Sequence, residues 1–258
     1  MIPYSVGFKT WRQYPSISAA YRQVWSNRLN AGKNAFSMRH IAMSDAFPGT
    51  KIDNDMGVVK SIYHYLKNIF KAQSLKSSAW VAPLRQEALE RYIKLNTTLM
   101  QKSPRITDLT SDAYQTELTE LVRKRDPEHL YRWTFHREVT PTRIVSLRAA
   151  DGHYGKDLPE TGCRVAVQAL VRFDTEQSVE IYDKHGRPLH TPAGSASLLA
   201  NADGEGAPRV GSKALQIVPA QRKRVTEYLV LDKPMYIPGA QWKFRARFVP
   251  TPGKTPAV

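Results

Sequence analysis

Cationic and aromatic side chains are interspersed through the first 44 residues, a stretch that contains no Asp or Glu. Arg and Lys neutralise phosphates, and aromatic rings stack on unpaired bases, so this pattern is typical of a segment that lies along RNA. We expect residues 1–52 to form a basic extension without a sustained hydrophobic period. The side chains expected to contact RNA are Lys9, Arg12, Arg22, Arg28, Lys33, Arg39, Trp11, Tyr14, Tyr21 and Trp25.

The same extension has a second interpretation. A segment that lacks acids and contains Ser and Arg has the composition of a mitochondrial transit peptide. The two interpretations are compatible if part of the segment is removed on import and the rest is retained.

A second group of cations lies on segments that alternate like strands. Arg222, Lys223 and Arg224 begin one predicted strand, and we include them among the expected RNA contacts. Arg132, Arg137, Arg143 and Arg148 lie on two earlier ones. Such cations form either a solvated sheet face or a surface that contacts phosphates.

No combination of residues in the sequence points to catalysis. Cys163 is the single cysteine, which excludes a disulfide framework and a zinc site built from cysteines. The seven histidines are scattered, and none forms a helical pair with a carboxylate in the manner of a zinc protease. We therefore predict no catalytic residue, no metal site, no cofactor and no enzyme activity, and we expect the inward-facing strand residues to be apolar or aromatic.

The overall charge agrees with a polyanionic partner. The 258 residues include 38 Lys and Arg against 23 Asp and Glu, which gives a net charge of +15. A balance this basic favours nucleic acid or an acidic membrane surface. The apolar fraction of 41% is sufficient for a folded core.

Residues 53–80 are predicted to hold an amphipathic helix, at about 55–73, and a linker. Apolar side chains recur there at helical spacing, and lysines occupy much of the remaining surface. A basic amphipathic helix suits a membrane interface, but the same stripe also suits packing against the domain or a neighbour. The residues assigned to this membrane or partner helix are Lys60, Lys67, Lys71, Ile62, Leu66 and Phe70.

The rest of the chain, residues 81–258, is predicted to be an α+β domain. Helical periodicity at 83–101 and 107–125 gives way to short alternating runs. Helices followed by strands indicate an antiparallel sheet packed on helices. An irregular insertion rich in Gly and Pro is expected at about 185–220. The predicted strands cover 130–139, 142–150, 163–173, 177–183, 224–233 and 241–250.

Several short segments, taken in order, resemble a known family. They include Tyr92 with Leu95-Asn96 in the first helix of the domain, and runs at 131–135, 143–148, 168–173, 176–179, 225–231 and 241–244. This ordered set, over about residues 84–250, is similar to the mitochondrial large-subunit ribosomal protein forty-five family. That family shares its domain with the C-terminal part of the forty-four-kilodalton subunit of the inner-membrane import motor, and the fungal ribosome receptor of the inner membrane looks related.

The resemblance implies a cone-like α+β domain similar to nuclear transport factor two, with a curved antiparallel sheet around a helix. It also implies a structural protein of the mitochondrial large ribosomal subunit, beside the polypeptide exit tunnel and facing the inner membrane. The implied partners are large-subunit rRNA, neighbouring ribosomal proteins, the inner-membrane lipid surface, the insertion machinery and the nascent chain. The implied location is the matrix, bound to the ribosome and peripheral to the inner membrane. The alternative is a peripheral import or insertion factor that acts as a ribosome receptor.

Overall fold

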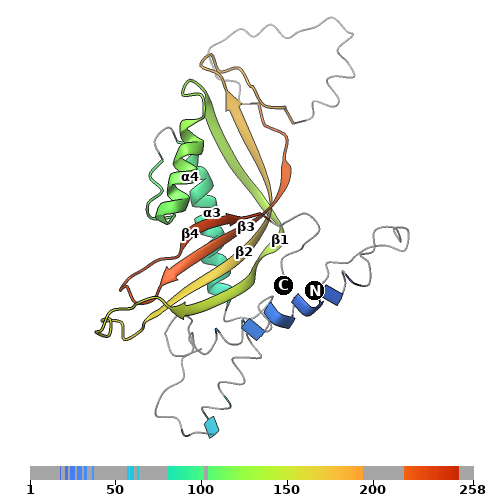
Figure 1. Cartoon of the computed structure of the whole chain (residues 1–258). Coiled ribbons are helices and arrows are strands. Elements are labelled where there is room, and N and C mark those ends of the chain that lie inside the picture. The colour runs from blue at the N-terminus through green and yellow to red at the C-terminus, as the bar shows by residue number, and fades with distance from the viewer. Residues whose placement is uncertain are drawn as a thin grey trace, which may run out of the picture. The chain divides into compact units, whose positions relative to one another are not determined.

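The computed structural model describes residues 81–101, 104–193 and 218–249, together with a set of N-terminal residues, namely 18, 21, 22, 24–26, 28–30, 32, 33, 37, 57, 59, 60 and 63 (Figure 1). The named elements are α3 (Ala82–Leu99), α4 (Asp112–Arg123), β1 (Leu130–Asp151), β2 (Val165–Tyr182), β3 (Lys223–Pro234) and β4 (Lys243–Phe248). The strands form one sheet in the order β1-β2-β3-β4, with β3 and β4 antiparallel. The predicted α+β class, with helices before an antiparallel sheet, is confirmed.

The prediction of six short strands is wrong, because two pairs of them are continuous. Residues 130–139 and 142–150 belong to β1, and residues 163–173 and 177–183 fall mostly in β2. Pro141 lies inside β1 and is exposed. A proline is tolerated in an edge strand because its missing N–H can face away from the ladder, and β1 is at one edge of the sheet.

The chain divides into two compact units, and α3, β1, β2 and β3 contribute to both. The first unit comprises residues 1–88, 142–172 and 227–258. Its core contains alternate residues of β2 and the apolar face of β3 and β4, where Val167, Ala169, Val171, Leu231 and Phe244 are all fully buried. This alternation follows from the two-residue period of a strand, which sends every second side chain to one face.

Gly152 shows how tightly the first unit closes at the end of β1. Its N–H donates to the Arg164 carbonyl at 2.7 Å. A Cβ at this position would lie 2.7 Å from the Ala166 Cβ and 2.8 Å from the Tyr236 ring. Glycine is therefore required by the close approach of its neighbours.

The second unit comprises residues 89–141 and 173–226, and aromatic rings fix α3 on its sheet. Tyr92 stacks on Phe173 with ring centres 4.5 Å apart and meets Trp133 edge-on at 6.1 Å. The Trp133 indole N–H donates to the Gln177 side-chain oxygen. Buried aromatic pairs in these geometries contribute about 0.5–1.5 kcal/mol beyond the area they bury.

The expectation that inward-facing strand residues are apolar or aromatic is wrong for part of β2. Asp174 is 1% exposed and Thr175 is fully buried, and Glu180 is 7% exposed. The Asp174 carboxylate accepts hydrogen bonds from Arg224 Nε at 2.8 Å and Nη2 at 2.7 Å. It also accepts from the Thr140 hydroxyl at 2.8 Å. These partners make the burial of the carboxylate tolerable.

The ends of the predicted insertion at 185–220 are held together. The Ala193 N–H donates to the Pro219 carbonyl at 2.8 Å, and the Gln221 N–H donates to the Thr191 carbonyl at 3.0 Å. His190 Nε2 lies 2.8 Å from the Val218 carbonyl. Residues 194–217, in which most of the predicted insertion falls, lie outside the described residues.

Replacing Phe173 by alanine tests the aromatic cluster. We expect Phe173→Ala to lower the free energy of unfolding by about 3–5 kcal/mol, because it removes a fully buried ring and leaves a cavity. Urea unfolding measures the change. Leu158→Ala is the control, because Leu158 is 65% exposed, and it should change stability by less than about 0.5 kcal/mol. Equal losses in the two variants would contradict the role of the cluster.

Candidate nucleic-acid interface

The described residues of the extension, which lie between Ser18 and Ser37, are all helical. No helix is predicted from the sequence within residues 1–52, so the helical state of these described residues is an addition from the structure. Tyr21, Trp25, Leu29 and Lys33 follow at intervals of four and so share one helix face. Tyr21 is 69% exposed and Trp25 is 53% exposed, so the rings are available to a partner.

Asn30 attaches this helical segment to β1 within the first unit. Its side chain is buried. Its Nδ2 donates to the Val145 carbonyl at 3.3 Å, and its Oδ1 accepts from Arg148 Nη2 at 2.6 Å. The Asn30 side-chain amide thus links segments more than a hundred residues apart. Both of its polar atoms have hydrogen-bond partners inside the protein, as buried polar groups require.

A hollow of about 640 Å³ lies between the helical segment and β1. Its lining combines cations with small and aromatic side chains, and none of the lining residues that the structure describes is acidic: Trp25, Arg28, Leu29, Gly32, Lys33, Ser37, Arg148 and Ala149. The structure therefore brings together three of the predicted RNA contacts, Trp25, Arg28 and Lys33, and adds a strand arginine to them.

Arg148 is the most enclosed cation of this hollow. Burial lowers the pKa of its guanidinium from the ordinary value. Hydrogen bonds from Nη1 to the Leu147 carbonyl and from Nη2 to Asn30 fix its orientation. A guanidinium stays charged at physiological pH, so Arg148 presents a fixed positive charge to an anion in the hollow.

The second predicted cluster, Arg222, Lys223 and Arg224, is exposed at the start of β3 in the second unit. Its members differ in how they are bound. Arg224 holds Asp174 through two nitrogens, and this hydrogen bond is the main cause of its raised pKa.

Arg222 lies near Glu176. The pKa of Glu176 is lowered, first by its hydrogen bond from Arg137 and, more weakly, by the charge of Arg222. Lys223 is the member of this cluster for which the described structure gives no such neighbour.

The other predicted contacts fall in two groups. Arg22 is helical and exposed, as is Lys60 of the predicted membrane or partner helix. Next to Lys60, Val59 is 82% exposed and Tyr63 is 60% exposed. The remaining predicted residues lie outside the described ones: Lys9, Trp11, Arg12, Tyr14, Arg39, Ile62, Leu66, Lys67, Phe70 and Lys71.

Asn30 is the residue of this candidate site that the sequence did not indicate. A polar residue in a basic segment gives no burial signal by itself. Tyr21, Trp25, Leu29 and Lys33 recur at intervals of four, and this spacing is the signal that predicts a helix. Such a helix would need a residue that holds it against the rest of the protein.

Among the residues that the structure describes, no group of three or more His, Cys, Asp or Glu side chains is placed to hold a metal ion. The described helices include none that combines the length and the apolar character needed to cross a membrane.

Fold and site together define an α+β protein whose antiparallel sheet carries a cationic and aromatic N-terminal helical segment. No family model matches the chain. It is 25% identical over 174 residues to the large ribosomal subunit protein mL45 of Drosophila melanogaster. The match covers 66% of this chain and 38% of that protein, so the chain spans well under half the length of its relative. This similarity confirms the resemblance to the large-subunit ribosomal protein family.

Replacing Asn30 tests the attachment of the helical segment. We expect Asn30→Ala to expose residues 18–37 to faster amide hydrogen exchange, because the Val145 carbonyl and Arg148 lose their shared partner. A buried polar group left unpaired costs about 1–3 kcal/mol, which corresponds to a marked loss of protection. Mass spectrometry of the exchanged peptides measures it. Arg22→Ala, which alters an exposed side chain of the same segment, should leave protection unchanged, and equal exchange in both variants would contradict the assignment.

Proposed function

We propose that this chain is a structural protein of the mitochondrial large ribosomal subunit that binds rRNA through the hollow between its N-terminal helical segment and β1. The observation that carries the proposal is the meeting of Trp25, Arg28, Lys33 and Arg148 around one hollow whose described lining has no carboxylate. The similarity to a protein named for the large ribosomal subunit supports it.

The chemistry of the hollow suits a nucleotide strand. Arg28 and Lys33 supply donors for phosphate oxygens, and the fixed charge of Arg148 adds to the attraction; each phosphate contact adds affinity that depends on salt. Trp25 supplies a half-exposed ring on which a base stacks. Arg222, just before β3, and Lys223, at its first position, extend the basic surface of the second unit, whereas Arg224 is bound to Asp174.

The wider role in this proposal follows from the family resemblance. The protein lies beside the polypeptide exit tunnel of the ribosome, in the matrix and peripheral to the inner membrane. Its partners are neighbouring ribosomal proteins, the insertion machinery and the nascent chain. Its role is structural, without catalysis. Its domain takes the cone-like arrangement of nuclear transport factor two, with residues 1–52 as extension and 53–80 as amphipathic helix and linker.

A second candidate function is that of a peripheral inner-membrane receptor that meets ribosomes transiently. The exposed Val59 and Tyr63 beside Lys60 favour it, because apolar side chains next to a cation suit the interface of an anionic membrane.

The salt dependence of RNA binding tests the hollow. We expect Arg28→Gln with Lys33→Gln to weaken binding of the full chain to a single-stranded fragment of large-subunit rRNA. The slope of log affinity against log salt should fall in magnitude by about 1.4, because two phosphate contacts are lost. Trp25→Ala should instead weaken binding while leaving this slope unchanged, because stacking releases no counterions. Fluorescence anisotropy over a range of salt concentrations measures both.

The matched control replaces Lys156 and Arg187 by Gln, two exposed cations outside the hollow. It removes the same charge and should keep both affinity and slope close to those of the parent chain. If the control and the Arg28 and Lys33 variant behave alike, only net charge matters and the hollow is not the site.

Sedimentation of the tagged protein distinguishes the two candidate functions. In detergent-solubilised mitochondria, the protein should migrate with the large subunit through a high-salt sucrose gradient. Replacing Lys9, Arg12, Arg22, Arg28, Lys33 and Arg39 by Gln should release it at lower salt, because the phosphate contacts of the extension are gone. Recovery of the parent protein at the top of the gradient, after retention on membranes before detergent, would instead favour the receptor.

A further inference from the structure

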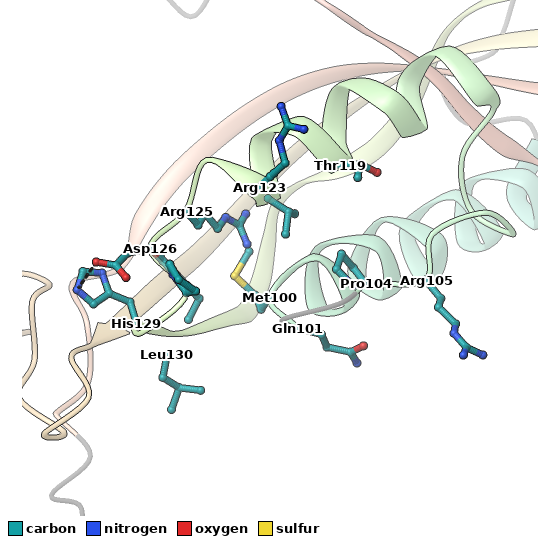
Figure 2. A pocket seen from close by; sticks show the side chains of 13 residues that line it. Met100, Gln101, Pro104, Arg105, Thr119, Arg123, Arg125, Asp126, His129 and Leu130 are labelled. Atoms are coloured by element: carbon teal, nitrogen blue, oxygen red, sulfur yellow. Dashed lines mark ion pairs between the residues drawn. The ribbon is translucent and has the colours of Figure 1, made fainter.

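A second hollow, of about 550 Å³, lies in the second unit where the end of α3, α4 and the start of β1 meet. Figure 2 shows the side chains around it, which come from the segment after α3, from α4 and the loop that follows it, and from the start of β1. Its apolar lining is made by Met100, Pro104, Val122, Pro127 and Leu130. A hollow of this size lies within the range of about 300–1,000 Å³ that is usual for binding sites.

Two charged groups of the lining, Arg125 and Asp126, are already bound within the protein. Arg125 Nη1 donates to the Leu99 carbonyl at 2.7 Å, and its guanidinium lies 5.2 Å from the centre of the Tyr131 ring. The Asp126 carboxylate accepts from the Glu128 N–H at 2.9 Å and lies 3.5 Å from His129 Nε2 (Figure 2). These contacts hold Arg125 and the carboxylate in place.

Two further arginines lie at the edge of the hollow and, unlike Arg125, are exposed. These are Arg105 and Arg123, and their side chains point outward on different sides of the hollow (Figure 2). Neither forms an ion pair with a carboxylate of the residues that the structure describes. The described lining thus holds three arginines against one carboxylate, so its charge complements an acidic ligand.

We propose that this hollow binds an amphipathic segment of a partner protein. Apolar side chains of the segment enter between α3, α4 and β1, and flanking carboxylates pair with Arg105 and Arg123. Arginine is suited to this role because its planar group binds carboxylates with two parallel hydrogen bonds. Apolar anchors inside a ring of charge pairs are the usual anatomy of a protein interface.

The lining favours a protein segment over RNA. Aliphatic and proline side chains offer no flat ring for a base. Of the two aromatic rings in the described lining, Tyr131 has one face covered by the Arg125 guanidinium, and His129 lies 3.5 Å from the Asp126 carboxylate. Because Arg125 is bound to the Leu99 carbonyl, phosphates would find arginines of the described lining without such a bond only at Arg105 and Arg123. The hollow shares no residue with the proposed rRNA contact, so this inference goes beyond the proposed function and can fail or hold independently of it.

A model peptide tests the inference on the full chain. The probe is a fluorescein-labelled helical peptide with leucine on one face and glutamate on the other, and its counterpart carries lysine in place of glutamate. We expect the glutamate peptide to bind at least about tenfold more tightly than the lysine peptide. Arg123→Glu and Val122→Asp should each weaken its binding at least about tenfold, measured by fluorescence anisotropy.

Neighbouring positions supply matched controls. Lys124→Glu makes the same charge change at the same end of α4, and Leu121→Asp places the same carboxylate on an exposed neighbour; neither residue lines the hollow. Both should bind the glutamate peptide as the parent does. Circular dichroism and thermal melting confirm that each variant is folded.

Three results would overturn the inference: equal binding of the two peptides, equal loss in the hollow and control variants, or displacement of the glutamate peptide by rRNA fragments at salt concentrations where they bind. Loss of peptide binding by Arg123→Glu with rRNA binding retained would support it. Loss of rRNA binding in the Arg28 and Lys33 variant, with peptide binding retained, would show that the two sites are separate.

Discussion

The Asp174 carboxylate is almost completely buried at the point in the second unit where three strands meet. Thr140 of β1 and Arg224 and Thr226 of β3 all donate to it. A buried charge without such partners would cost several kcal/mol, so this set of donors constrains which residues of β1, β2 and β3 lie opposite one another. A one-residue slip of either neighbour would turn its donors to the opposite face.

Pairing with carboxylates also distinguishes the exposed cations from one another. The Arg224 side chain is 58% exposed, yet its guanidinium nitrogens bind the Asp174 carboxylate. Arg137 binds Glu176 through its Nε at 2.6 Å. Arg28 and Lys33 line a hollow whose described residues include no carboxylate. Exposure alone therefore does not identify a phosphate-binding cation; the absence of a nearby carboxylate is the more informative property.

Much of the fold was predictable from periodicity, and the errors have a physical cause. The helix predicted at 83–101 is α3, because Leu84, Ala88, Tyr92, Leu95 and Leu99 form its buried face. The strand breaks predicted near Pro141 and Asp174 were wrong. Proline at the edge of a sheet and a polar run inside one both resemble turns in sequence. Only the partners contributed by distant strands show that β1 and β2 continue through them.

The candidate site was predictable in residue type but not in assembly. Composition identifies Trp25, Arg28 and Lys33 as suited to RNA, since cations and rings without acids are visible in any sequence. What makes them a site is the attachment of Asn30 to Val145 and Arg148, which joins segments more than a hundred residues apart. The described apolar side chains of this segment are largely exposed, so they contribute little burial. Its position then depends on such specific hydrogen bonds, and their loss would leave the cations present but no longer gathered around one hollow.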